Sequence, residues 1–205
     1  RTRTELDGSV ARARLAAFLL LTLPGTPFVY YGEEIGMGGG KPDERIRTPM
    51  QWTAEPGAGF TTGTPWQPLA EDAREFTVAA QDADPHSILN LHRRLIHLRA
   101  ADPALGAGEL VPLEASDPAV VAFLRVDGER RALVVANLGE RALAGVRVTA
   151  DPALISAFDF RTPPRASFGD GELGVLHADT QRGAATVFTL SLAPLEGYVF
   201  DVSAR

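Results

Sequence analysis

Residues 30–52, YYGEEIGMGGGKPDERIRTPMQW, bring carboxylates, guanidinium groups and aromatic rings together in one short stretch. A carboxylate can exchange a proton or bind a cation, and an arginine offers a rigid fork of N–H donors to hydroxyls and carboxylates. Charged groups among glycines and aromatic rings are typical of the rim of a binding site. We therefore expect this stretch to border a site.

The elements before this stretch must position it. Residues 9–22 predict a helix that Asp7 or Ser9 can cap, and its apolar second half indicates burial in a larger body. A Pro-Gly pair ends the helix, and residues 28–31 then predict a short buried strand. Helix, tight turn and buried strand in this order favour a parallel α/β fold.

Residues 36–86 are rich in glycine and proline and are predicted to be mostly loop. A loop of this length in a compact domain usually has a function. Residues 85–99 predict a second helix, with Asp84 as its cap and Pro85 in its first position. Its apolar stripe consists of Ile88, Leu91, Leu95 and Leu98.

From about Gly106 the pattern becomes β-rich. Two β-rich runs on either side of Asp127-Gly128 predict a hairpin. Further strands are predicted at 146–150, 155–160, 185–192 and 197–202. The fold class is therefore α/β plus all-β, with residues 1–105 in a first domain and residues 106–205 in an antiparallel β-sandwich.

Two motifs together resemble a known family. The stretch LPGTPFVYYGEEIGM (23–37) followed by RTPMQW (47–52) is similar to the α-amylase family, glycoside hydrolase family 13. The resemblance is dense in residues 15–52 and weak across 106–205. It implies that residues 1–105 are the C-terminal part of a catalytic (β/α)₈ TIM barrel: helix 7, strand 8, a long loop and helix 8. Residues 106–205 would be the family's C-terminal β domain.

The resemblance implies a retaining mechanism, with one carboxylate as nucleophile, one carboxylic acid as proton donor and a third carboxylate that holds the sugar. The family places them after strands four, five and seven, and nothing in this chain matches those positions. Glu33 and Glu34 do not replace them, because adjacent residues leaving a strand point opposite ways. We assign no catalytic residue, Asp43 and Glu44 included, and expect the chain to be inactive alone.

The chain begins Arg-Thr-Arg-Thr without an initiator Met. We interpret this start as a cut inside a longer protein, with ordinary processing or tag removal as the alternative. The family's third carboxylate lies in an Asn-His-Asp motif that continues x-x-Arg. Arg1 or Arg3 fits that arginine, and a solvated charge at the chain end is the alternative.

The resemblance also implies sugar contacts within the chain. Arg47 matches an arginine that relatives with RTPMQW place against the sugar, and its alternative role is an ion pair with Asp43 or Glu44. Trp52 and Trp66 can stack on sugar rings, although packing is the usual role of a lone tryptophan. The substrate-binding candidates are Arg47, Arg1 and Trp52.

The same motif indicates the substrate. RTPMQW is typical of oligo-1,6-glucosidases, α-glucosidases and trehalose synthases, but the short insert GGGKPDERI is closer to α-amylases that act on α-1,4-glucans or malto-oligosaccharides. An interpretation of another class is a carbohydrate-binding or scaffold module built on the β domain. Alternation places its aromatic residues in a core instead, namely Phe123, Phe158, Phe160, Phe188, Tyr198 and Phe200.

Composition excludes several other classes. The chain has 205 residues and a formal net charge of −6, which disfavours nucleic acid and anionic membranes as partners. It contains no cysteine, and its four histidines lack the spacing of a zinc site. We expect no cofactor within the chain. Calcium would bind mainly upstream in a longer parent, and the cellular location stays open.

Overall fold

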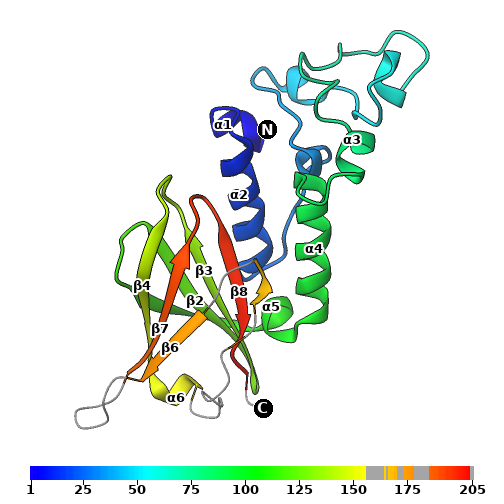
Figure 1. The fold of residues 1–205 in the computed structure, drawn as a ribbon. Coiled ribbons are helices and arrows are strands. Elements are labelled where there is room, and N and C mark those ends of the chain that lie inside the picture. Colours follow the sequence, from blue (N-terminus) through cyan, green and yellow to red (C-terminus); the bar gives the residue numbers. More distant parts are fainter. Residues whose placement is uncertain (156–163, 165, 170–172, 178–184, 204–205) are drawn as a thin grey trace. The chain divides into compact units, whose positions relative to one another are not determined.

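The computed structural model describes residues 1–155, 164, 166–169, 173–177 and 185–203 (Figure 1). Its contacts divide the chain into two compact units. Unit 1 contains residues 1–20 and 26–96, and unit 2 contains residues 21–25 and 97–205. The domain boundary between residues 105 and 106 stays a prediction.

Helices and loops make up the described part of unit 1. The α-helices are α1 (Thr2–Glu5), α2 (Val10–Thr22), α3 (Val78–Asp82) and α4 (Ile88–Ala101), and α2 and α4 each end in unit 2. The loop between α2 and α3 contains the 3₁₀ turns η1 (Glu33–Ile35), η2 (Asp43–Ile46) and η3 (Pro56–Gly59). Figure 1 shows that the rest of this long loop has no regular structure, as predicted.

The helix predicted at 9–22 is confirmed as α2. Its cap is Ser9, whose Oγ accepts the backbone N–H of Arg12 at 3.2 Å. Asp7, the other candidate, forms an ion pair with the Arg12 side chain at 2.9 Å instead. A capping oxygen matters here because the first N–H groups of a helix have no partner within it.

The buried strand predicted at 28–31 is wrong. These residues have no strand assignment, and all four side chains are exposed, Phe28 to 86%. A strand exists only through hydrogen bonds to a neighbouring strand. Every strand in the described part of the chain lies between residues 109 and 201, so segment 28–31 has no partner in unit 1.

The predicted second helix forms, but it begins later than expected. Ser87 precedes α4, and its Oγ accepts the N–H of Asn90 at 3.1 Å. Asp84 instead closes a turn by accepting the N–H of His86 at 2.8 Å, so Pro85 also lies before the helix. In the predicted stripe, Ile88, Leu91 and Leu95 are buried and Leu98 is half-buried.

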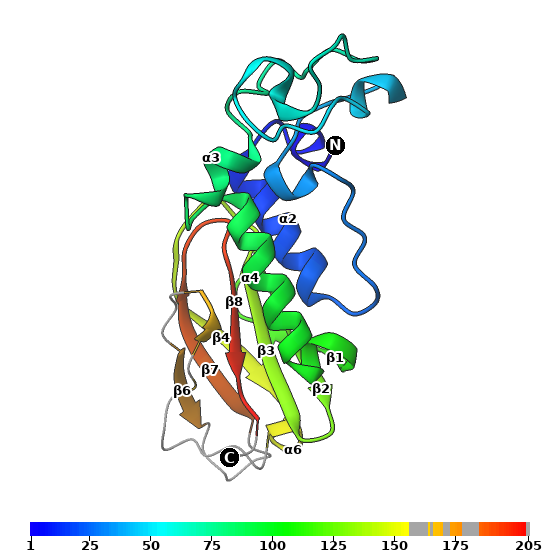
Figure 2. The same cartoon turned by 90° about the vertical axis from the view of Figure 1, so that its right-hand side faces the viewer.

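Unit 2 contains one eight-stranded antiparallel sheet, with the strand order β5-β8-β3-β2-β1-β4-β7-β6 (Figures 1 and 2). The strands are β1 (Glu109–Ala115), β2 (Val120–Asp127), β3 (Arg130–Asn137), β4 (Leu143–Ala150), β5 (Ala166–Phe168), β6 (Leu173–His177), β7 (Thr186–Leu192) and β8 (Gly197–Asp201). The described part of unit 2 also contains two short helices, α5 (Pro103–Ala107) and α6 (Pro152–Ile155), and α5 packs on β2 and β3.

The sheet is continuous, whereas a sandwich was predicted. Strand β1 pairs with β2 through residues 109–113 and with β4 through Glu114 and Ala115, so it joins the two halves. The halves curl around one core, to which β2, β3 and β8 contribute from one side and β4 and β7 from the other. The antiparallel β class is therefore confirmed, with one curled sheet in place of two.

Most predicted strands are found. The hairpin of β2 and β3 turns at Gly128 and Glu129, with Asp127 paired to Arg130. Of the strand predicted at 155–160, Ile155 ends helix α6 and residues 156–160 lie outside the described residues. Four of the six aromatic residues assigned to the core are buried, namely Phe123, Phe188, Tyr198 and Phe200. Phe158 and Phe160 are not described.

Two arginines of unit 2 bind the backbone at the end of α2. Arg125, which is 1% exposed, donates to the carbonyl of Thr22 at 2.5 Å and twice to the carbonyl of Gly108, at 2.8 and 3.2 Å. Arg99 donates to three further carbonyls, those of Leu21, Leu23 and Gly25. The last carbonyls of a helix lack partners within it and carry partial negative charge, so cations are favoured here. Burial lowers the pKa of both guanidinium groups.

A buried glutamine holds the loop of unit 1 to α4. The Gln81 side chain donates from Nε2 to the carbonyl of Ile35 at 2.7 Å, and its Oε1 accepts the N–H of Leu89 at 3.1 Å. Gln81 is 9% exposed, so water does not readily replace either bond. This amide therefore positions the start of the charged stretch.

Replacing Arg125 by Met should lower the free energy of unfolding by about 3 kcal/mol, because two buried carbonyls lose their donors. Urea unfolding measures the change. The exposed Arg147→Met is the matched control and should shift stability by no more than about 0.5 kcal/mol. Equal midpoints for the two variants would contradict the capping role of Arg125.

Replacing Gln81 by Met should cost about 2 kcal/mol and expose the Leu89 amide, since the variant keeps the side-chain length but loses both hydrogen bonds. Hydrogen exchange measures the protection of the Leu89 amide, and urea unfolding measures the free energy of unfolding of the whole chain. Ala79→Met, at an exposed position of the same helix, is the control. Unchanged protection of the Leu89 amide in Gln81→Met would refute the bridge.

Candidate functional site

The first residues of the charged stretch are held by a small apolar cluster. Ile35, Met37, Met50 and Leu89 are buried together, and Val78 packs against them. Gly32 adopts a φ of +82°, and a Cβ there would lie 2.2 Å from the Met37 sulfur. Only glycine fits this approach, so the turn after residue 31 is determined by local packing.

A pocket of about 270 Å³ lies beside this cluster, and we call it the Arg47 pocket. Its lining includes Tyr31, Arg47, Thr48, Phe60, Trp66 and Gln67. Phe60 is 54% exposed and Trp66 is 70% exposed. The pocket therefore combines open aromatic surface with one cationic group, a composition suited to a polar ligand that also has an apolar face.

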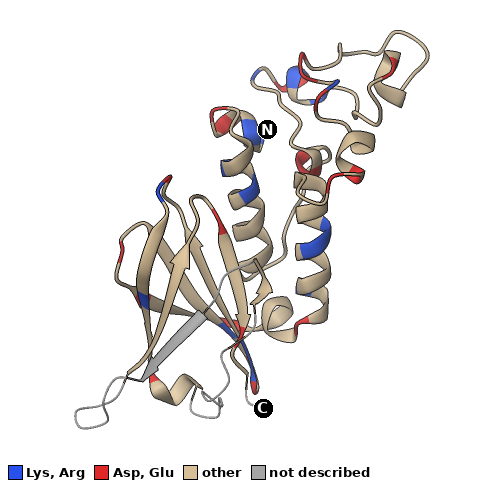
Figure 3. Ribbon diagram, in the orientation of Figure 1, with Lys and Arg blue, Asp and Glu red and all other residues tan. Residues whose placement is uncertain are grey.

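Arg47 is only loosely engaged by its neighbours. Its Nη2 lies 3.8 Å from an Asp43 carboxylate oxygen, and both side chains are at least half exposed. Asp43 has a closer partner in Lys41, at 2.5 Å, and the Lys41 hydrogen bond lowers the pKa of the Asp43 carboxyl. Figure 3 shows acidic and basic residues side by side at η2. An exposed ion pair of this kind contributes little to stability. The Arg47 guanidinium is therefore available to bind a ligand.

Arg1 lies behind the wall of the Arg47 pocket. Its guanidinium carbon is 4.6 Å from the Tyr30 ring centroid and 4.5 Å from that of Tyr31, and its Nη1 donates to the Tyr31 carbonyl. The Tyr31 hydroxyl in turn donates to the carbonyl of Thr48 at 2.9 Å. Arg1 therefore helps to hold Tyr31 in place, and Tyr31 lines the pocket.

The predicted binding residues are thus only partly brought together. Arg47 lines the pocket with Trp66, while Trp52 is 48% exposed but is not part of the lining. The sugar-binding roles of Arg47, Arg1 and Trp52 stay predictions. Phe60 and Gln67 gave no signal in the sequence, because they lie in a loop without periodicity.

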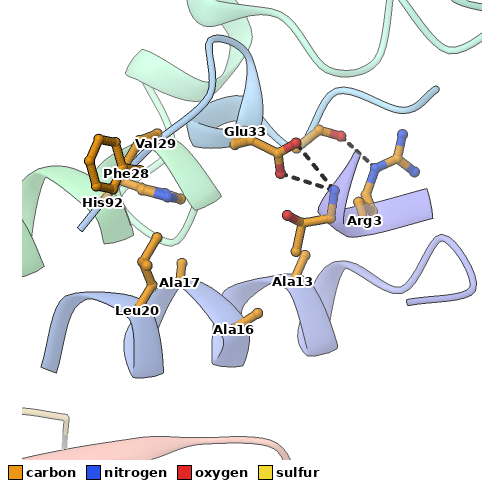
Figure 4. A pocket seen from close by; sticks show the side chains of 11 residues that line it. Arg3, Ala13, Ala16, Ala17, Leu20, Phe28, Val29, Glu33 and His92 are labelled. Atoms are coloured by element: carbon orange, nitrogen blue, oxygen red, sulfur yellow. Dashed lines mark hydrogen bonds between the residues drawn. The ribbon is translucent and has the colours of Figure 1, made fainter. Parts of the chain in front are cut away.

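Two other charged residues of this region, Glu33 and Arg3, have structural partners. Both Glu33 carboxylate oxygens accept the N–H of Thr2, at 3.1 and 3.2 Å (Figure 4). Arg3 is 9% exposed and forms an ion pair with Asp72. Its guanidinium carbon lies 3.9 Å from the Phe76 ring centroid. These contacts order the loop and α1, so Glu33 and Arg3 both have structural roles.

A second pocket has a volume of about 280 Å³. Figure 4 shows residues that line it. Ala13, Ala17 and Leu20 of α2 line it together with Phe28 and His92. The Nδ1 of His92 lies 3.0 Å from the carbonyl of Ile88, and burial lowers the pKa of the imidazole. A neutral, hydrogen-bonded histidine in this position is a packing residue.

The described residues offer neither a metal site nor a membrane-spanning helix. No group of three or more His, Asp or Glu side chains there could hold a metal ion. In the same part of the chain, none of the helices has the length and apolarity needed to cross a membrane.

The known proteins that resemble this chain indicate one family. Residues 1–108 match the family model for the α-amylase catalytic domain. Alpha-amylase 3 of Dictyoglomus thermophilum is 37% identical over 138 residues, which is 67% of this chain and 28% of that protein. A trehalose synthase of Thermus thermophilus is 39% identical over 145 residues, covering 65% of this chain and 15% of that protein.

A solved structure extends the likeness to nearly the whole chain. The crystal structure of an α-amylase from H. orenii covers 97% of this chain and 37% of its own, at 28% identity and a TM-score of 0.71. The chain thus spans well under half the length of the proteins it matches. Since the catalytic-domain model matches more than half of its residues, the chain belongs to the α-amylase family, glycoside hydrolase family 13.

Proposed function

We propose that this chain is the C-terminal part of a retaining hydrolase acting on α-1,4-linked glucans or malto-oligosaccharides. The observation that carries the proposal is the Arg47 pocket, where Arg47 and Trp66 line one cavity within the residues that match the catalytic domain. The α-amylase relative supports the same substrate class.

The chemistry of the Arg47 pocket suits a glucosyl ring. One face of the ring carries C–H groups, which pack on exposed aromatic surface such as that of Trp66 and Phe60. Its vicinal hydroxyls accept N–H bonds, and the guanidinium of Arg47 offers two donors in parallel. Arg47 would thus set the orientation of the ring while the aromatic residues supply contact area.

Residues 1–105 would complete a (β/α)₈ barrel and residues 106–205 would form its C-terminal β domain. The exposed apolar run Phe28–Tyr31 supports this assignment, because strands of such a barrel are covered on both faces. In the whole enzyme this run would become the eighth strand, paired with strands of the preceding part of the barrel. The catalytic carboxylates would also lie there, so the 205-residue chain alone would release no sugar.

A parent of the trehalose synthase type is the second candidate, because the trehalose synthase is 39% identical where the α-amylase is 37% identical. An α-glucosidase or oligo-1,6-glucosidase parent belongs to the same group of alternatives. Maltose separates them: a hydrolase yields glucose, whereas a trehalose synthase would yield trehalose.

A carbohydrate-binding or scaffold module is less well supported. Its usual basis would be exposed aromatic residues on the β domain, but Phe123, Phe188, Tyr198 and Phe200 are buried. Retention of the isolated chain on insoluble starch after Trp66→Ala and Arg47→Ala substitution would favour that alternative, because binding would then not require the Arg47 pocket.

In the whole enzyme, Arg47→Ala should lower kcat/KM for maltotriose by tens-fold, on the order of 2 kcal/mol for a lost charge-assisted contact. Initial rates of reducing-sugar release provide the measurement. Arg74→Ala removes an exposed positive charge outside the pocket and should retain the parent rate within about twofold. Near-native kinetics in Arg47→Ala would sink the sugar-binding role of Arg47.

A further inference from the structure

The Arg47 side chain is loosely paired, whereas the backbone on both sides of it is fixed. Its Nη2 lies 3.8 Å from an Asp43 carboxylate oxygen, and its side chain is 57% exposed. The Arg47 backbone N–H, in contrast, donates to the carbonyl of Glu44 at 3.1 Å. The carbonyl of the next residue, Thr48, accepts the Tyr31 hydroxyl at 2.9 Å. Because a long side chain without a close partner keeps many rotamers, its backbone decides which region the guanidinium can reach.

We propose that Tyr31 is a positioning residue for Arg47, because its hydroxyl holds the Thr48 carbonyl and thereby directs the neighbouring side chain toward the sugar. Arg1 contributes by holding Tyr31 in turn. This inference rests on the proposed function. It adds that Tyr31 and Arg1 act on the sugar through Arg47 and not through contacts of their own.

The Tyr31 side chain connects two fixed points of the loop. At its backbone end, the Tyr31 carbonyl accepts a hydrogen bond from Nη1 of Arg1, and the next residue, Gly32, turns the chain with a φ of +82°. At its other end, the hydroxyl donates to Thr48, a residue that is 7% exposed. Water does not readily replace a bond to a residue this buried, so the tyrosine links the turn at Gly32 to Thr48.

Arg1 holds this tyrosine by both its ring and its backbone. Arg1 is 8% exposed, and its guanidinium carbon lies 4.5 Å from the Tyr31 ring centroid. A contact between a cation and an aromatic ring is stronger where water is excluded. The same planar group donates to the Tyr31 carbonyl. A Cβ on Gly32 would lie 3.2 Å from Arg1 Nη1, so the glycine leaves room for this approach.

The Tyr31 hydroxyl keeps the proton that this role requires. Burial raises the pKa of the Tyr31 phenol above its ordinary value, the nearby Arg1 charge opposes this rise, and Tyr30 adds to it. The phenol is therefore neutral at neutral pH and can donate. A backbone carbonyl only accepts hydrogen bonds, so the group opposite the Thr48 carbonyl must be a donor. Phenylalanine supplies the same ring without that donor.

The experiment is a double-mutant cycle in the whole enzyme, with kcat/KM for maltotriose as the readout. Tyr31→Phe should lower kcat/KM by about fivefold or more when Arg47 is present. In the Arg47→Ala background, the same substitution should change kcat/KM by less than about twofold, because the residue through which Tyr31 acts is gone. Arg1→Lys keeps the positive charge but loses the planar fork, so its effect should depend on Arg47 in the same way.

Tyr198→Phe is the matched control. The Tyr198 hydroxyl accepts the N–H of Ala193 at 3.1 Å and donates to the Glu196 carboxylate at 3.2 Å. The substitution therefore also deletes a hydrogen-bonded tyrosine hydroxyl, but one in unit 2 and outside the lining of the Arg47 pocket. It should leave kcat/KM within about twofold of the parent. A loss in Tyr31→Phe alone then does not reflect a general loss of stability.

A loss in Tyr31→Phe that is equally large with and without Arg47 would overturn the inference, since Tyr31 would then act independently of Arg47. Unchanged kcat/KM in both Tyr31→Phe and Arg1→Lys would overturn it too. The proposed function would survive either result, provided that Arg47→Ala lowers kcat/KM by tens-fold. A near-native rate in Arg47→Ala, or a whole enzyme that releases no sugar from maltotriose, would instead contradict the proposed function and the inference with it.

Discussion

The side-chain amide of Gln81 joins the loop that carries the candidate site to the helix beside it. It donates to the carbonyl of Ile35 and accepts the N–H of Leu89, and it is almost fully buried. The loop has neither a strand ladder nor a long helix to satisfy its backbone groups, so side chains must do so. Ile35 and Leu89 also belong to the buried cluster beside the Arg47 pocket, so that cluster depends on this anchoring.

In unit 2, arginine side chains satisfy backbone groups in the same way as Gln81 does in unit 1. Arg99 and Arg125 donate to backbone carbonyls at the C-terminal end of α2 and in the turn that follows it. Both guanidinium groups are bound by backbone carbonyls, and the Arg125 side chain is nearly inaccessible to water. In each unit a buried polar side chain thus replaces the regular hydrogen bonds that loops and helix ends lack.

Periodicity predicted the parts of the fold that local chemistry determines. Helix α2 and strands β2, β3, β4, β7 and β8 follow the expected patterns closely. The beginning of α4 was misjudged because Asp84 and Ser87 are both competent caps, and sequence alone does not say which one closes a turn. Segment 28–31 has the composition of a buried strand, but strand formation needs a neighbour that the described residues of unit 1 do not contain.

Residues of the candidate site could be predicted from the sequence only where they lie in a recognised motif. Arg47 follows from RTPMQW, whereas Gln67 and Gln81 are isolated polar residues whose roles depend on what folds against them. The aromatic lining shows the same limit, because Trp52 lies in the motif but Trp66 lines the pocket. Long-range loop packing decided between these two tryptophans, and no local pattern encodes it.

A crystal structure of the protein with maltopentaose tests the central claim most directly, because it locates the sugar without relying on catalysis. The account predicts a glucosyl ring packed on Trp66, with hydroxyls within hydrogen-bond distance of the Arg47 guanidinium. An ordered sugar bound elsewhere, with the Arg47 pocket holding none, would contradict it.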